Sequence, residues 1–329
     1  MPIIEKDWNV QRSSIVIKGS LCLPAEGRFP IALILQGSGQ VDRNGNVRGR
    51  GPAIYAKLAR ALAEFGVASY RYDKRGAGAS GGNFLETGYH DLVGDAQACW
   101  ESLVTAPFCD PERMYMVGHS EGTAMAAQLA ARVVHRPRAL VQLCPFVDGA
   151  EAMLIHQADQ IERELPDVPG LLGLILRVMN RLTGPYGQSL RKLLERVRTL
   201  EGGTVRLGSA RVSARWLREL IELDMHRIYR DVPCPMLLLS GEKDLQCTPD
   251  SAGKLAELVD VPTEHHVVPD MIHHLSACEG PPALFDLRDI DPLPLSPALL
   301  ECLQQWFARE SIDKRVPDEE APALGPSGA

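Results

Sequence analysis

The chain has 329 residues, 45% of them hydrophobic, which is typical of a globular protein with one large domain or two smaller ones. Its formal net charge of −7 and its pI near 5.8 argue against a nucleic-acid-binding protein. No apolar run approaches the ~18 residues of a membrane span, and residues 1–10 lack the apolar core of a secretory signal.

Predicted strands and helices alternate along the first 145 residues. Two short strands, at 14–18 and 20–23, are expected to pair as a hairpin. Apolar strands are then expected at 31–36, 67–72, 114–117 and 139–143, and helices at 52–65, 90–104 and 120–134. Continuous apolar strands between helices indicate a mostly parallel sheet covered by helices on both faces.

The alternation stops between residues 146 and 230, where the sequence has helical patterns and no convincing strand. The helices expected there are 150–164, 171–182, 189–200 and 214–223. Strands resume at 235–240 and 265–268, with a helix at 249–259 between them and a last helix at 297–309.

The sequence therefore predicts an α/β core made of residues 1–145 and 231–312, interrupted after the sixth strand by a helical insertion, 146–230. Ligands of such sheets bind at the carboxyl ends of the strands, where the insertion would act as a lid. The Pro- and Glu-rich tail, 313–329, is expected to be disordered.

Eight cysteines are scattered singly, and none forms a Cys-x-x-Cys pair. We therefore predict no metal site. Without a signal sequence, a reduced, cytoplasmic location is the simplest expectation. Cys247 follows a candidate catalytic aspartate closely, and we interpret it as a lining residue and not as a nucleophile.

The segment Gly118-His119-Ser120-Glu121-Gly122 joins a predicted strand to a predicted helix. A serine at a sharp strand-to-helix turn projects its hydroxyl clear of the backbone, and small flanking residues let the turn close. The N–H of Glu121 would lie at a helix N-terminus, where it can donate to a developing oxyanion. Ser120 is therefore a candidate nucleophile, and it requires a base, an orienting acid and a second oxyanion donor.

The orienting acid is expected in the loop that directly follows the strand at 235–240. Asp244 lies in this loop, where a carboxylate can reach a histidine. Glu242 and Asp250 are the competing carboxylates.

Two adjacent histidines, His273 and His274, follow the strand at 265–268. Neighbouring side chains diverge, so only one of them can point at Ser120. We favour His273 as the base and keep His274 as the alternative. The order Ser120, Asp244, His273 is the one expected for the α/β-hydrolase arrangement, and it differs from the orders of chymotrypsin and subtilisin.

The strand at 31–36 runs into a Gly-rich loop, residues 37–46, whose backbone N–H groups can approach a substrate oxygen closely. By position, we expect the Ser38 N–H to be the second oxyanion donor, with Gly39 as the alternative. The Gly-x-x-x-x-Gly-Lys-Ser/Thr pattern of a phosphate loop is absent, which disfavours nucleotide binding.

Five segments resemble the α/β-hydrolase superfamily, within a branch of bacterial serine esterases and peptidase-like hydrolases. They are the Gly-Ser-Gly-Gln-Val-Asp-Arg-Asn-Gly-Asn loop (37–46), Arg-Tyr-Asp-Lys-Arg-Gly-Ala-Gly-Ala-Ser (71–80), the elbow (118–122), Gly-Glu-Lys-Asp (241–244) and Asp-Met-Ile-His-His (270–274). The resemblance spans about residues 10–145 and 231–310. Gln40 stands where the family loop has proline, and His274 stands where relatives have a small apolar residue.

We interpret the chain as a serine hydrolase that cleaves a carboxylic ester or thioester through an acyl-enzyme and needs no cofactor. The same residues could serve an aminopeptidase or amidase, or an acyltransferase. A ligand-binding protein without activity would not require an ordered Ser-His-Asp set. The expected partner is a small acyl substrate, and the sequence leaves the oligomeric state open.

The insertion has a basic stretch: residues 170–220 contain ten Lys and Arg and three Glu, a balance of +7. It forms either ordinary solvated helix faces or a surface that attracts an anionic acyl substrate. Apolar residues of the same helices are expected to line the underside of the lid or to form its packing face. They are Leu171, Leu172, Leu174, Ile175, Leu176 and Met179.

Overall fold

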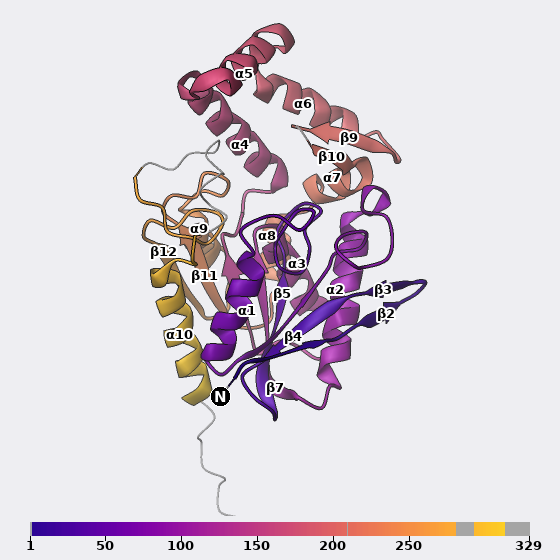
Figure 1. Ribbon diagram of the computed structural model, residues 1–329, viewed down its shortest axis with the longest axis vertical. Helices are drawn as coiled ribbons and strands as arrows, with labels where there is room; N and C mark the ends of the chain where they lie inside the picture. The colour runs from indigo at the N-terminus through magenta and orange to yellow at the C-terminus, as the bar shows by residue number, and fades with distance from the viewer. Residues whose placement is uncertain (1, 209, 281–292, 313–329) are drawn as a thin grey trace, which may run out of the picture.

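An eight-stranded sheet forms the centre of the computed structural model, which describes residues 2–208, 210–280 and 293–312 (Figure 1). The strand order is β1-β4-β6-β5-β7-β8-β11-β12. The strands are β1 (Ile4–Asp7), β4 (Gly19–Leu23), β5 (Phe29–Leu35), β6 (Ala68–Tyr72), β7 (Cys109–His119), β8 (Ala139–Leu143), β11 (Met236–Gly241) and β12 (Thr263–Val268). All neighbours from β6 to β12 are parallel, whereas β4 and β1 are antiparallel, which confirms the mostly parallel sheet.

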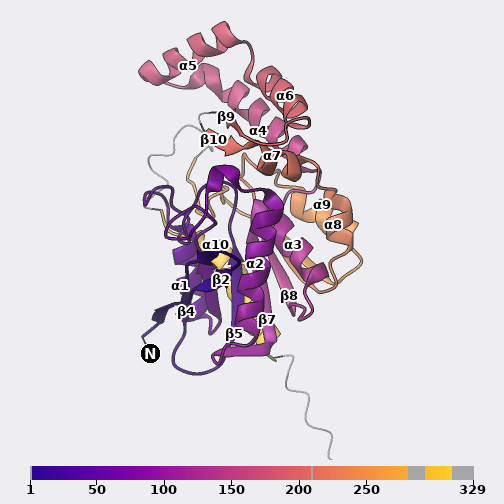
Figure 2. The ribbon, with the colours of Figure 1, turned by 90° about the vertical axis from the view of Figure 1, so that its right-hand side faces the viewer.

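Helices cover both faces of the sheet. Side chains of a strand alternate between the two faces, and apolar side chains on each face need a covering layer. Ile31, Leu33 and Leu35 of β5 pack into one core, and Ala32 and Ile34 into the other. The first core includes α2 (Tyr89–Val104), α3 (Glu121–Arg132), α8 (Met225–Arg230) and α9 (Ser251–Leu258). The second includes α1 (Ile54–Glu64) and α10 (Pro297–Ile312). Figures 1 and 2 show the two layers from perpendicular directions.

The predicted hairpin between residues 14–18 and 20–23 is wrong. β3 (Ile15–Ile17) pairs with β2 (Val10–Arg12), and β4 pairs with β1 and β6 in the main sheet. Ser13, with φ of 50°, helps to form the tight turn between β2 and β3. Only Lys18 separates β3 from β4, which is too short a connection for the chain to reverse.

The insertion follows β8, the sixth strand of the main sheet along the chain, and stands beyond one end of the sheet (Figures 1 and 2). Its elements are α4 (Ala150–Glu164), η2 (Leu165–Asp167), α5 (Gly170–Thr183), α6 (Tyr186–Val197), β9 (Thr204–Leu207), β10 (Ala210–Ser213) and α7 (Ala214–Ile221). None of the helices in the described ranges has the length and hydropathy of a bilayer-spanning segment. The predicted tail, 313–329, lies outside the described residues.

The expectation that the insertion contains no strand is wrong, because β9 and β10 form an antiparallel hairpin. Val205 pairs with Val212 on its buried side, and Arg206 pairs with Arg211 on its exposed side. Each strand has only four residues. One residue of β9, Val205, is buried, and two residues of β10, Val212 and Ser213, are buried. Such short segments do not show a recognisable alternation of apolar and polar residues.

Candidate active site

Ser120 lies at the sharp turn between β7 and α3, with φ of 54° and ψ of −121°. An L-residue rarely adopts this backbone conformation, so neighbouring hydrogen bonds must hold it. The Ser120 N–H donates to Leu143 O at 3.0 Å, and the Ser120 carbonyl oxygen accepts from Thr123 N at 2.9 Å. The turn is thus fixed from both sides of the serine.

The glycines that flank Ser120 allow this turn. A Cβ on Gly118 would lie 2.5 Å from Gly122 O, and a Cβ on Gly122 would collide with the carbonyl group of Leu35. Close contact between α3 and the central strands β5 and β7 therefore requires glycine at both positions.

Asp244 and His273 form a buried pair, with Nδ1 of His273 2.8 Å from Oδ2 of Asp244. The other oxygen, Asp244 Oδ1, accepts the N–H groups of Gln246 at 2.7 Å and Cys247 at 2.9 Å. Burial by itself raises the pKa of Asp244, but His273 and these hydrogen bonds outweigh it and keep the pKa below its usual range. The carboxylate is therefore ionised and fixed in orientation at neutral pH.

The competing residues have other partners. Glu242 Oε2 accepts the backbone N–H of Asp270, and Asp250 forms an ion pair with Lys254. The ring of His274 lies perpendicular to that of His273, with centroids 6.2 Å apart. Of the two adjacent histidines, His273 is the one hydrogen-bonded to Asp244.

Ser120, His273 and His274 line one cavity of about 360 Å³. No hydrogen bond joins Ser120 Oγ to the His273 ring among the described residues; such bonds often tighten only when substrate binds. The insertion supplies part of the wall from three elements. These residues are Met153, Leu154 and Gln157 of α4, Leu207 of β9, and Trp216 and Leu220 of α7.

The basic and apolar side chains of α5 and α6 do not form this wall. None of the ten basic residues between 170 and 220 lines the cavity. Leu171, Leu174 and Ile175 are exposed to solvent, so the expectation that they line the lid or pack inside it is wrong. The side chains of Leu172 and Met179 lie outside the described part of the structure.

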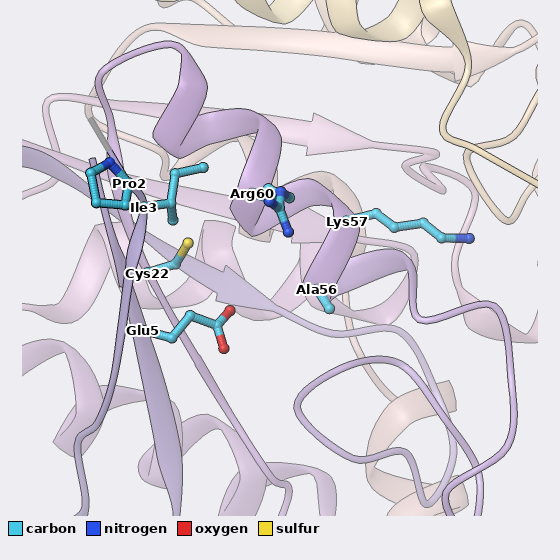
Figure 3. Close-up of a pocket in the computed structure, with 7 residues that line it drawn as sticks. All are labelled: Pro2, Ile3, Glu5, Cys22, Ala56, Lys57 and Arg60. Carbon is cyan, nitrogen blue, oxygen red and sulfur yellow. The ribbon is translucent and has the colours of Figure 1, made fainter. Parts of the chain in front are cut away.

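A larger hollow, about 420 Å³, lies between α1 and the sheet edge formed by β1 and β4 (Figure 3). Glu5, Cys22 and Arg60 are among its lining residues. Burial raises the pKa of the Cys22 thiol, and Glu5 pairs with Arg71, so Cys22 is not an activated thiolate.

The loop that carries Ser38 is held by its neighbour Gly37. The Gly37 N–H donates to Tyr55 Oη at 2.7 Å, and Lys74 Nζ donates to Gly37 O at 2.5 Å. The Ser38 N–H makes no hydrogen bond within the described residues. The Glu121 N–H opens helix α3, where a first-turn amide lacks an intrahelical acceptor. Ser38 lines the cavity, and the role of the two N–H groups as oxyanion donors stays a prediction.

The two motif segments at 37–46 and 71–80 bind each other. Asp73 accepts the backbone N–H of Arg43 at 2.7 Å and pairs with its guanidinium at 2.9 Å. Gln40 Nε2 donates to Gly76 O at 2.7 Å. These contacts fold the loop that presents Ser38.

Three buried side chains connect this loop, the elbow and the insertion, and the sequence analysis did not predict their contacts. Lys74 Nζ donates to Glu121 Oε2 at 2.9 Å, and Trp216 Nε1 donates to Glu121 Oε1 at 2.5 Å. Lys74 and Glu121 are each about 1% exposed. Lys74 follows β6 by two residues, and no pattern in the sequence indicates that it would pair with Glu121 or that Trp216 would join them.

His119 has a structural role that its position in the elbow did not reveal. Its Nε2 is 2.9 Å from His273 O, and its Nδ1 is 2.9 Å from Tyr55 Oη. The carbonyl can only accept, so Nε2 carries the proton and Tyr55 donates to Nδ1. Burial, together with the neighbouring His273, lowers the pKa of His119 to about 3.

Two groups of potential metal ligands overlap the site: His119, Cys144 and His273, and Asp244, Cys247 and His273. Both ring nitrogens of His119, both carboxylate oxygens of Asp244 and Nδ1 of His273 already take part in the hydrogen bonds above, which a metal on these atoms would have to displace. Burial raises the pKa of Cys144 and Cys247 well above the usual value, so neither is a ready thiolate. The absence of a metal stays a prediction.

Comparison with curated proteins gives partial matches. An uncharacterized protein of Mycobacterium tuberculosis is 38% identical over 113 residues, 34% of this chain and 38% of that protein. Esterase EstD of Thermotoga maritima is 26% identical over 283 residues, 82% of this chain and 60% of EstD. The chain thus covers less than two thirds of either relative.

Among solved structures, Est1E of Butyrivibrio proteoclasticus with bound ferulic acid has a TM-score of 0.61 at 16% identity, over 93% of this chain and 100% of that one. At this identity the likeness shows the fold alone, which is the predicted α/β-hydrolase fold. A family model for the serine aminopeptidase S33 family matches residues 51–277, most of the chain. The chain therefore belongs to the serine aminopeptidase S33 family of α/β-fold hydrolases.

Proposed function

We propose that the chain is a serine hydrolase that cleaves carboxylic esters or thioesters through an acyl-enzyme. The observation that carries this proposal is the buried Asp244–His273 pair, which opens onto the same cavity as the strained Ser120. The similarity of the chain to esterase EstD favours the same class of reaction.

In the proposed reaction Ser120 Oγ attacks the substrate carbonyl and His273 takes its proton. The Ser38 and Glu121 N–H groups stabilise the oxyanion. His273 then protonates the leaving alcohol or thiol, and water hydrolyses the acyl-enzyme by the same route in reverse. Asp244 orients His273 and stabilises the imidazolium.

An aminopeptidase is the second candidate, since the family is named for this activity. A protonated substrate amine binds most strongly to a carboxylate. The described lining of the cavity contains no Asp or Glu. This absence favours an ester or thioester over a peptide with a free amino terminus. Acyl transfer to an alcohol or amine uses the same residues and is a further alternative.

We also propose that residues 146–230 act as a lid on a core of residues 1–145 and 231–312. The side chains of α4, β9 and α7 in the cavity wall support this division. The last helix of the range 146–230, α8, packs on α3 beside the sheet and not over the cavity wall.

The basic stretch of the insertion suggested an anionic substrate, but its side chains lie outside the cavity wall. A different basic residue, Arg50, is better placed to bind such a substrate. Arg50 lines the cavity, and its side chain makes no ion pair or hydrogen bond with the described residues. No other Arg or Lys is among the described lining residues. We therefore place the preference for an acyl group bearing a carboxylate at Arg50.

Initial rates on chromogenic esters of increasing acyl length, thioesters and aminoacyl amides test the reaction class. The proposal predicts turnover of esters or thioesters well above that of the amides. Preferential cleavage of aminoacyl amides would favour the aminopeptidase.

A further inference from the structure

A small hollow of about 120 Å³, the side pocket, lies between α4 of the insertion and the loop that follows Asp244. Met153 of α4 and Gln246 of the loop line both this pocket and the active-site cavity. The two spaces are therefore neighbours that share part of their walls. The reaction proposed above uses the cavity and gives the side pocket no role.

Helix α4 presents a different side to each of the two spaces. Successive residues of a helix are about 100° apart, so Ala152 and His156 share one side, and Leu154 and Gln157 share another. The first pair lines the side pocket, and the second pair lines the active-site cavity. Met153 falls between the two pairs and lines both spaces. It is therefore the side chain of α4 that divides the side pocket from the cavity.

The contacts that hold this division are weak. The Cys247 thiol donates to the Met153 thioether at 3.9 Å, and both sulfur groups are poor hydrogen-bonding partners. Gln157 Nε2 donates to Gln246 O across a long distance of 3.4 Å. A methionine side chain has three rotatable bonds and adapts readily to its surroundings. An entering chain can therefore displace Met153 and join the two spaces.

The interior of the side pocket suits an apolar group. Its most deeply buried apolar lining residues are Phe146, Val147 and Cys247. Polar groups of the lining already have partners: the hydroxyls of Thr248 and Ser251 are 2.9 Å apart, and Asp148 forms an ion pair with Lys254 at 3.2 Å. No Arg or Lys is among the described lining residues of the pocket. The pocket therefore favours a hydrocarbon chain over a charged group.

The place of the side pocket beside His273 indicates which part of a substrate enters it. Cys247 Sγ, a carboxylate oxygen of Asp244 and a ring nitrogen of His273 lie within 4.8 Å of one another. In the proposed reaction His273 protonates the leaving oxygen or sulfur, which must then lie at its ring. The acyl group is assigned above to the part of the cavity that carries Arg50, which does not line the side pocket. The leaving group is thus the part of the substrate next to this pocket.

We propose that the side pocket binds the alkyl chain of the leaving alcohol or thiol, and that Met153 turns aside to admit it. The inference rests on the proposed hydrolase function and narrows its substrates to esters or thioesters with an apolar, unbranched leaving group. In the reaction the bond between the carbonyl carbon and the leaving oxygen or sulfur breaks. His273 gives that atom its proton, and the chain leaves as the alcohol or thiol.

Two series of esters test this assignment on the full chain. Alkyl acetates from methyl to hexyl extend the leaving group, and methyl esters from acetate to hexanoate extend the acyl group. We expect kcat/KM, measured in a pH-stat, to rise along the alkyl acetates by up to about fourfold per methylene.

Ala152→Phe and Met153→Ala change the side pocket in opposite directions. Ala152 lines the pocket and not the cavity, so a ring at this position narrows the pocket alone. The ratio of kcat/KM for hexyl acetate to that for methyl acetate should fall at least tenfold in Ala152→Phe. It should rise severalfold in Met153→Ala, because the division between the two spaces is removed.

Asp159→Phe is the matched control. Asp159 is exposed on the same helix, about two turns beyond Ala152, and lines neither space. This variant should keep the ratio of the natural chain, and circular dichroism verifies that all three variants are folded. An equal change of the ratio in Ala152→Phe and Asp159→Phe would overturn the proposal. A loss confined to the longer acyl esters in Ala152→Phe would assign the pocket to the acyl chain and overturn it as well.

Binding of 1-hexanol to Ser120→Ala, followed by ligand-detected NMR, tests the pocket without turnover. Ala152→Phe in this background should weaken binding at least fivefold, and Asp159→Phe should not. Hexanol binding of this kind in a chain that hydrolyses no ester would overturn the proposed reaction and support the alkyl-binding pocket. Ester hydrolysis without any effect of leaving-group length would overturn the pocket and leave the reaction standing.

Discussion

Trp216 of the insertion donates a 2.5 Å hydrogen bond to Glu121, the residue that follows the candidate nucleophile. The other carboxylate oxygen of Glu121 accepts from Lys74, which also donates to Gly37 next to Ser38. One buried carboxylate therefore links the insertion, the elbow and the oxyanion loop. Its own backbone N–H is an expected oxyanion donor, so displacement of the side chain would disturb the proposed catalysis.

Trp216→Phe keeps the ring and removes the donor, which leaves one buried oxygen of Glu121 without its partner. We expect a loss of about 1–3 kcal/mol in the free energy of unfolding, measured by urea denaturation. We also expect ester kcat/KM to fall roughly tenfold through misplacement of the oxyanion donors. Trp100→Phe is the control: Trp100 donates to His135 O away from the site, so it should lose stability without the loss of activity. Equal activity losses in the two variants would contradict the link.

His273→Ala should lower kcat by about 10³-fold or more, because it removes the proposed base. His274→Ala should stay within a few-fold of the natural chain, since its neighbour is the one bonded to Asp244. Asp244→Asn should cost about 10⁴-fold in kcat with little change in KM. Steady-state kinetics on a soluble ester measure all three. Activity that survives the loss of His273 and disappears with His274 would reverse the assignment.

His119 should make the fold less stable as the pH drops below 6.5. Its pKa of about 3 in the folded chain lies below the ordinary value of 6.5, so the unfolded chain binds more protons between these limits. The stability present above pH 6.5 is then lost on acidification, by about 1.4 kcal/mol per pH unit at most. Urea denaturation at pH 7 and pH 5 measures the slope.

His119→Gln supplies the comparison, since glutamine cannot titrate. Its stability should be lower at pH 7, because the bonds to Tyr55 and His273 O are impaired, yet it should fall less between pH 7 and 5. The same slope in both proteins would show that His119 is not the group responsible.

Arg50→Ala should reduce kcat/KM for an ester with a terminal carboxylate about fivefold at low salt, as expected for one exposed charge pair of about 1 kcal/mol. The matched neutral ester should be unaffected. Arg48→Ala is the control, because this exposed arginine in the same loop does not line the cavity. A similar loss on both esters would place Arg50 in the folding of the loop and not in substrate recognition.

The sequence predicted the parallel strands well, because their runs are apolar on both faces and end at recognisable turns. It also placed Ser120, Asp244 and His273 at strand ends, and the structure brings all three to a single region. The hairpins were predicted poorly. The strands β2, β3, β9 and β10 have three or four residues each, too few for a hydrophobic period to emerge.

Contacts between distant residues could not be predicted. Nothing in the spacing of Lys74, Glu121 and Trp216 indicates that they meet, since their pairing depends on how the insertion returns to the sheet. The apolar residues of α5 have the pattern of a packing face, and only the structure shows that this face has no covering element in the described chain.

Labelling with a fluorophosphonate probe tests the central claim most directly, because the probe reacts with a serine only where a base activates it. The natural chain should be labelled on Ser120, identified by mass spectrometry of the modified peptide, and pre-incubation with an ester substrate should slow the reaction. Ser120→Ala should lose both the label and ester turnover while keeping its urea denaturation midpoint. Labelling or turnover that persists in Ser120→Ala would contradict the account.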